Sequence, residues 1–178
     1  MKKNMYVIPF KGLKESNHQF EFHIKKEFFD FYQYDDIYNA DVSVQLDFNK
    51  KSTLIELEFK ANEIVELVCD LTNELYQEPI KAKLSLVIKF GEVFNDDDID
   101  VLILPHEAYE VDVSQYIYEM IVLAIPSKRI HPGIKDGTLK SEILDKLEEL
   151  KPKEVINNKE GSDPRWDKLK GLITDKKV

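Results

Sequence analysis

Apolar and polar residues alternate through much of the chain, which is the pattern of strands that bury one face. The first such stretch is residues 20–24, and aromatic side chains at 28–32 then indicate a short turn or helix. Residues 42–48 and 53–59 alternate on either side of the polar segment 49–52. Two alternating runs joined by a short polar segment predict a β-hairpin.

Further strands are predicted downstream of this hairpin. Residues 60–63 have the composition of a second turn, leading into an apolar stretch at 64–69. Residues 82–90 alternate again, with lysines on the polar side, and 99–104 form a short apolar run that stops at Pro105. Antiparallel strands joined by short turns account for this spacing.

One segment departs from the two-residue period. Between 112 and 125, Ile117, Met120 and Ile121 recur at helical spacing, and apolar residues surround them almost completely. Asp112 and Gln115 resemble a capping box at the start. We therefore predict an α+β fold, in which a mainly antiparallel sheet packs against one core helix, followed by a partly disordered helical C-terminal tail.

The composition changes after Pro126, so we predict a globular domain over 1–126 and an accessory region over 127–178. The accessory region begins with a basic, loop-like stretch at 127–137. Residues 139–150 have an apolar stripe and predict an amphipathic helix. A polar linker, 151–162, has too few apolar residues to bury and is predicted to be disordered.

The only tryptophan of the chain follows this linker. Asp163 can cap a helix whose first residue is Pro164, and Trp166 and Leu169 then share one face with Arg165 beside them. A helix this short is marginal in water, so it must dock on this protein's own body or on a partner. The long polar linker favours a partner, and Trp and Arg are frequent hot spots of binding.

The formal net charge of −9 decides which partners suit the chain. Nucleic-acid binding relies on Lys and Arg beside phosphates, so this charge argues against broad RNA or DNA binding and favours a basic protein. The single cysteine cannot form an intramolecular disulfide, which is typical of a reducing compartment. No apolar window is long enough to span a membrane. We therefore expect a cytoplasmic protein that does not bind membranes.

A local basic cluster is still present in this acidic chain. Lys128, Arg129 and His131 stand close together just after the predicted core helix. Cations suit the end of a helix, where the dipole is negative, so the cluster could be no more than a solvated loop. It could equally contact phosphates of RNA.

No residue set predicts catalysis or a cofactor. Asp96, Asp98, Asp100 and Glu107 have the spacing of a calcium loop, but Val101 stands where that loop needs glycine. An acidic turn before a strand explains them better. The four histidines lack partners at metal-ligand spacing, and the six glycines form no phosphate loop. We therefore expect a protein without metal or cofactor that is not an enzyme.

Several short motifs resemble the YceD-like family, whose members are called large ribosomal RNA subunit accumulation proteins. They are Gly12-Leu13-Lys14, Phe28-Phe29, Val68-Cys69-Asp70, Val87-Ile88-Lys89-Phe90-Gly91, Val111-Asp112-Val113-Ser114, Tyr118-Glu119, Ala124-Ile125-Pro126 and Asp163-Pro164-Arg165-Trp166 through Leu169. Family members often have Cys-x-x-Cys where this chain has Cys69 and Thr72, and many have further cysteines. Those departures leave no cysteine-based metal site here.

The resemblance implies a role in producing or stabilising the large-subunit ribosomal RNA, without supplying a reaction. We expect a non-enzymatic assembly factor whose acidic body binds a ribosomal protein or another assembly factor, while the basic cluster reaches rRNA. One alternative is a general protein-binding adaptor unrelated to ribosomes. Another is a nuclease of rRNA precursors, for which the aspartates at 96–100 are the only compact carboxylate cluster.

Overall fold

The computed structural model describes residues 3–151 of the chain. A 3-10 helix, Lys3–Tyr6, leads into the first strand. The strands are β1 (Val7–Pro9), β2 (Asn17–Lys25), β3 (Ile37–Lys50), β4 (Leu54–Val68), β5 (Leu75–Gly91), β6 (Val101–Pro105) and β7 (Glu110–Asp112). The helices are α1 (Lys26–Phe31), α2 (Ser114–Ala124), α3 (Pro132–Lys135) and α4 (Glu142–Leu150).

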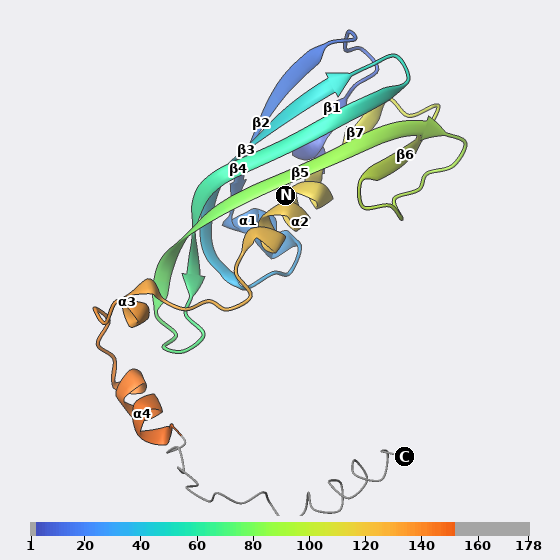
Figure 1. The fold of residues 1–178 in the computed structure, drawn as a ribbon. Helices are drawn as coiled ribbons and strands as arrows, with labels where there is room; N and C mark the ends of the chain where they lie inside the picture. Colours follow the sequence, from blue (N-terminus) through green and yellow to red (C-terminus); the bar gives the residue numbers. More distant parts are fainter. Residues whose placement is uncertain (1–2, 152–178) are drawn as a thin grey trace, which may run out of the picture. The chain divides into compact units, whose positions relative to one another are not determined.

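The main element of the fold is a five-stranded sheet with the order β2-β3-β4-β5-β6 (Figure 1). The first four strands are antiparallel neighbours, and the predicted hairpin corresponds to β3 and β4. β6 pairs with β5 in the parallel direction, so the sheet is mixed. The predicted α+β class is confirmed, and the antiparallel prediction holds for every pair of the main sheet except this last one.

The turn predicted at residues 60–63 is wrong. β4 continues through it, and Ala61 lies opposite Ala82 in an unbroken antiparallel register with β5. The side chain of Ala61 is buried, in phase with Phe59 before it and Val65 after it. Pairing with β5 along its whole length holds β4 extended, and this outweighs the weak strand propensity of Ala and Asn.

The core lies on the inner face of the main sheet. Inward side chains of the strands, chiefly Val, Ile, Leu and Phe, are almost fully buried, as the alternation predicts. Phe48 and Phe59 are among the largest fully buried side chains. A second, two-stranded sheet of β1 and β7 adds Ile8 and Val111 to the same core. This small sheet joins segments about one hundred residues apart, so no local pattern predicted it.

The helices α1 and α2 both bury side chains in the core. α2 packs against β5 and buries Ile117, Met120 and Ile121. α1 lies against β2 and β3 and buries Phe28 and Phe29. The prediction of one core helix is therefore confirmed only in part, because the aromatic stretch after β2 forms a second one.

The start of α2 differs from the predicted capping box. The backbone N–H of Ser114 donates to Oδ1 of Asp112 at 2.9 Å, and Gln115 donates from its side chain to Glu119 instead of back to the helix start. The helix is also not buried all round, because the side chain of Leu123 is 85% exposed. One side of α2 therefore faces solvent.

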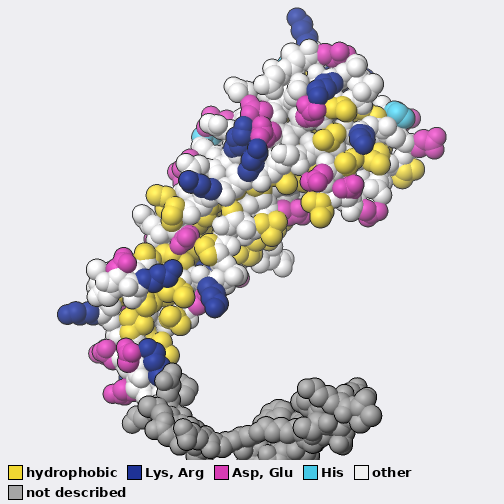
Figure 2. All heavy atoms as spheres, viewed as in Figure 1, with side chains coloured by type: hydrophobic (Ala, Val, Ile, Leu, Met, Phe, Trp, Pro, Cys, Tyr) yellow, Lys and Arg dark blue, Asp and Glu magenta, His cyan; other side chains and the backbone are white. Residues whose placement is uncertain are grey.

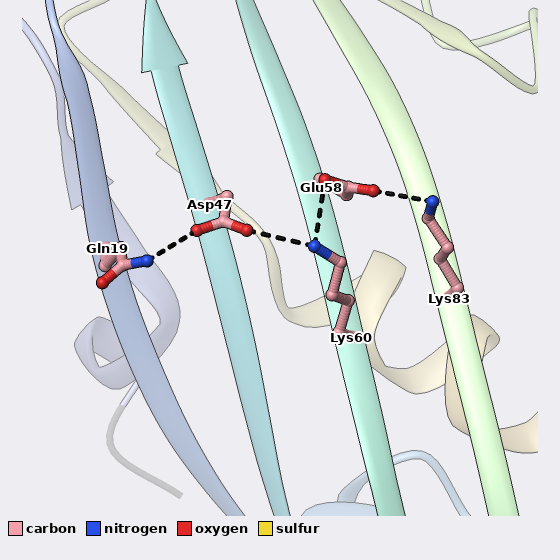
Figure 3. A network of polar contacts seen from close by, with 5 residues as sticks. All are labelled: Gln19, Asp47, Glu58, Lys60 and Lys83. Atoms are coloured by element: carbon pink, nitrogen blue, oxygen red, sulfur yellow. Dashed lines mark hydrogen bonds and ion pairs between the residues drawn. The ribbon is translucent and has the colours of Figure 1, made fainter.

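The outer face of the main sheet is polar. A chain of contacts runs across four strands, from Gln19 on β2 to Asp47, Lys60, Glu58 and Lys83 (Figure 3). Acidic and basic side chains are interspersed on the face seen in Figure 2. Exposed pairs like these contribute little stability each, and their arrangement keeps charges of one sign from gathering on this face.

The segment after α2 contains more structure than the predicted basic loop, because residues 132–135 form α3. The amphipathic helix predicted at 139–150 is confirmed as α4, although it begins at Glu142. The chain separates between Leu144 and Asp145 into two units, which are described separately. The predicted boundary at residue 126 stays a prediction. The polar linker and the Asp163–Leu169 motif lie outside the described residues.

Candidate functional site: a strap across the β4–β5 turn

Residues 126–131, which we call the strap, cross the end of the hairpin formed by β4 and β5 (Figure 1). Residues 69–74 close that hairpin, and Asn73 has a φ of 57°, the left-handed conformation that Asn tolerates in tight turns. The N–H of Asp70 donates to the carbonyl of Arg129 at 2.8 Å. In return, the N–H of Arg129 donates to Oδ2 of Asp70 at 2.8 Å. The strap is thus hydrogen-bonded to the turn in both directions.

The Arg129 side chain strengthens this attachment. Its Nε donates to Oδ1 of Asp70 at 3.1 Å, and its Nη1 lies 2.6 Å from Oδ1 of Asp36. Asp36 comes from the loop between α1 and β3, so one guanidinium joins three distant segments. Planar guanidinium groups with several donors suit such multiple pairing. Arg129 therefore acts mainly as a link within the protein and has few donors left for phosphate.

These contacts shift the ionisation of both partners. The backbone hydrogen bond from Arg129 is the largest cause that lowers the pKa of Asp70, and the guanidinium charge adds to it. The hydrogen bond to Asp36 is the largest cause that raises the pKa of Arg129. The cluster is therefore charged on both sides at neutral pH, which keeps the strap attached.

The next contact of the strap involves the only cysteine. The N–H of His131 donates to Sγ of Cys69 at 3.3 Å, and Cys69 is completely buried. Burial tends to raise the pKa of the thiol, but hydrogen bonds with Thr72 and His131 outweigh it and lower the pKa overall. Nδ1 of His131 accepts from the N–H of Gly133 at 2.9 Å and so caps α3. Both residues therefore have structural partners.

An unpaired phenol lies next to the strap. The ring of Tyr76 packs near that of His131, with centroids 5.7 Å apart, and its side chain is 4% exposed. Among the described residues its hydroxyl has no hydrogen-bond partner. Burial, with a smaller contribution from Glu78, raises the pKa of Tyr76 to about 12, so the phenol stays neutral.

The candidate residues of the sequence thus have different surroundings. Lys128 is exposed, and no carboxylate pairs with it within residues 3–151. Arg129 and His131 are partly buried and bonded to the turn. Sequence reasoning missed Asp36 and Asp70 as the partners of Arg129, although Asp70 stands inside one of the quoted motifs. Asp163, Pro164, Arg165, Trp166 and Leu169 lie outside the described residues.

The acidic segment before β6 has no metal-ligand geometry. Oδ1 of Asp98 accepts from the N–H of Asp100 at 3.1 Å, and β6 begins at the next residue. Within the described part of the chain, no three His, Cys, Asp or Glu side chains converge on a possible ion. Over the same residues, no helix is both long enough and apolar enough to cross a membrane.

Residues 57–173 match the family described as large ribosomal RNA subunit accumulation protein YceD. The match covers well over half of the 178 residues. The chain belongs to the YceD family. The matched region includes β5, the β4–β5 turn and the strap, whereas Asp36 precedes it. No curated protein and no solved structure matched the chain.

Proposed function

We propose that this YceD-family protein supports the accumulation of large-subunit rRNA without catalysing a reaction, by binding a ribosomal protein or another assembly factor. Membership of the family is the observation that supports this proposal most directly. The net charge of −9 adds to it, because an acidic protein attracts basic partners at long range. Proteins that assemble on rRNA need basic surfaces, and such surfaces complement this chain.

Only a small part of the protein surface, within the strap, would contact rRNA itself. Lys128 is the exposed cation of the strap, whereas Arg129 is paired with Asp36 and Asp70. We therefore assign the direct phosphate contact to Lys128 and a positioning role to Arg129. Trp166 remains the proposed anchor for a protein partner, on the strength of the sequence alone.

The test is a deletion strain in which the ratio of large- to small-subunit rRNA and the precursor species are measured. We expect the deletion to lower the ratio and wild-type protein to restore it. Lys128→Gln should restore it less well, while its purified form unfolds like wild type. A normal ratio and normal precursors in the deletion strain would refute the proposal.

Catalysis has its own assay. Purified protein is incubated with precursor rRNA and Mg²⁺, and we expect the RNA to stay intact. Cleavage that disappears in both Asp96→Asn and Asp98→Asn would instead assign a nuclease to the acidic segment.

A further inference from the structure

The sheet has a free edge that ends where β6 begins. Within residues 3–151, β6 pairs with β5 only from Val87 to Gly91, so residues 75–86 of β5 have a strand neighbour, β4, on one side alone. The N–H of Val87 donates to Asp100 at 2.8 Å, and the carbonyl of Gly91 accepts from His106 at 3.1 Å. These two odd-numbered residues therefore direct their backbone groups away from β4.

Backbone groups alternate sides along a strand, so Lys81, Lys83 and Ser85 direct theirs to the same edge. No hydrogen bond within residues 3–151 occupies the backbone groups of these three residues on that side. Pro79, which has no N–H, stands two residues before them. Pro79 interrupts the row of free donors, and Lys81, Lys83 and Ser85 form the uninterrupted run next to β6.

A groove of about 400 Å³ lies along this run. Its walls are β5, α2 and the loop before β6, and Asn95 of this loop forms an antiparallel bridge with Ile103 of β6. Ile99 and Leu123 line it and are each 85% exposed, so both offer apolar surface to an occupant of the groove. The volume is within the range of ligand-binding clefts.

The charges of the groove favour a basic occupant. Its lining has the carboxylates of Asp96, Asp97, Asp98 and Glu119 against the ammonium groups of only two lysines. One of these, Lys83, is already paired with Glu58 on the outer face at 2.7 Å. The loop and α2 each present carboxylates beside an exposed apolar side chain, Ile99 on the loop and Leu123 on α2, so a bound segment would meet both kinds of side chain.

We propose that an extended, basic segment of a partner protein adds to the free edge of β5 as a further strand, in line with β6. Main-chain hydrogen bonds to Lys81, Lys83 and Ser85 supply affinity, and alternate apolar side chains contact Ile99 and Leu123. The inference deepens the proposed function and rests on it, because the basic partner is taken to be a ribosomal protein of the large subunit.

The test uses the full-length chain and overlapping peptides that cover the ribosomal proteins of the large subunit. The tightest binder is resynthesised with one backbone amide N-methylated at a time, because methylation removes a donor and leaves the side chain unchanged. We expect affinity to fall about tenfold or more at every second position and to change little between them. Equal effects at all positions, or no bound peptide, would overturn the proposal.

Variants of the chain test whether the peptide binds in the groove. Leu123→Ser and Ile99→Ser should each weaken binding about fivefold to tenfold, because they remove an apolar contact. Val93→Ser is the matched control, since Val93 is 73% exposed in the same loop but lies outside the groove. Equal affinities for all three variants would contradict the assignment.

Ser85→Pro removes one edge donor directly and should abolish binding of the peptide. A proline can also disturb β5. The binding result for Ser85→Pro is therefore used only if its far-ultraviolet circular dichroism is that of wild type; otherwise the binding result for Leu123→Ser decides between the outcomes.

Light scattering tests whether a second copy of this chain occupies the edge instead. A dimer that Leu123→Ser dissociates would assign the edge to self-association and overturn the proposal.

Failure of the proposed function is recognised separately. The rRNA ratio of the deletion strain tests it without reference to the groove. Normal rRNA in a strain that carries Leu123→Ser, together with reduced rRNA in the deletion strain, would reject the groove and leave the proposed function standing.

Discussion

Helix α2 offers a sharp test of the packing, because its two sides differ in burial. Ile117 is completely buried between α2 and the sheet, whereas Leu123 on the same helix is 85% exposed. We predict that Ile117→Ala strongly destabilises the protein and that Leu123→Ala does not. Leu123 also lines the groove beside β5, so the same stability measurement shows whether a substitution at Leu123 leaves the chain folded.

The magnitude follows from burial. Replacing Ile by Ala removes carbon groups worth about 0.8 kcal/mol each, or about 2.4 kcal/mol together when the side chain is fully buried. The cavity that remains adds to this, so the free energy of unfolding should fall by about 3 kcal/mol, within the observed range of about 2–5 kcal/mol. Leu123→Ala should change it by less than about 0.5 kcal/mol, since the side chain is in water and Ala favours helices.

Urea unfolding followed by far-ultraviolet circular dichroism measures both variants. With a slope of about 1–3 kcal/mol per molar urea, Ile117→Ala should lower the midpoint by roughly 1–3 M. Ile117→Val provides a graded control and should cost about 0.5–1.5 kcal/mol. Similar losses for Ile117→Ala and Leu123→Ala would show that α2 does not pack as described.

Three further outcomes are expected around the strap. Arg129→Gln should lower the urea midpoint, and Lys128→Gln, a substitution at the exposed neighbouring residue, should leave it unchanged. Equal midpoints for the two variants would show that the contact between Arg129 and Asp70 does not stabilise the fold. The pKa of Asp70 is lowered in the folded state, so its stabilising effect is complete above the unfolded value of about 3.9 and is lost as the pH falls through the lower folded value. The stability gap between wild type and Asp70→Asn should therefore close on acidification, and a constant gap would contradict the pairing. Tyr76→Phe deletes a buried hydroxyl that has no partner within residues 3–151, so the melting temperature should stay equal or rise, and a clear fall would reveal a partner.

The local pattern of apolar and polar residues predicted the structure correctly where residues close in sequence determine it. The alternation in β2, β3 and β5 predicted which residues are buried, since one face of each strand meets the core. The same reasoning failed at Ala61 and Asn62, where pairing with β5 keeps the chain extended against its local preference. It also missed the small β1–β7 sheet, whose strands are distant in sequence.

The candidate site shows the same division. The basic residues of the strap and the motif around Cys69 and Asp70 were visible in the sequence, but their contact was not. Arg129 and Asp70 are separated by 59 positions, and only folding brings them within hydrogen-bond distance.

The amino-acid sequence by itself determined the α+β class, the inward face of most strands, the acidic character and the resemblance to the YceD family. Each of these depends on residue type and short-range spacing. The tertiary structure alone decided that Arg129 is a link within the protein and that β6 runs parallel to β5. It also decided that, within the described residues, part of the β5 edge beside Leu123 and Ile99 has no strand neighbour. Those features depend on which distant segments become neighbours, and hydrogen-bond pairing and burial across the whole domain select them.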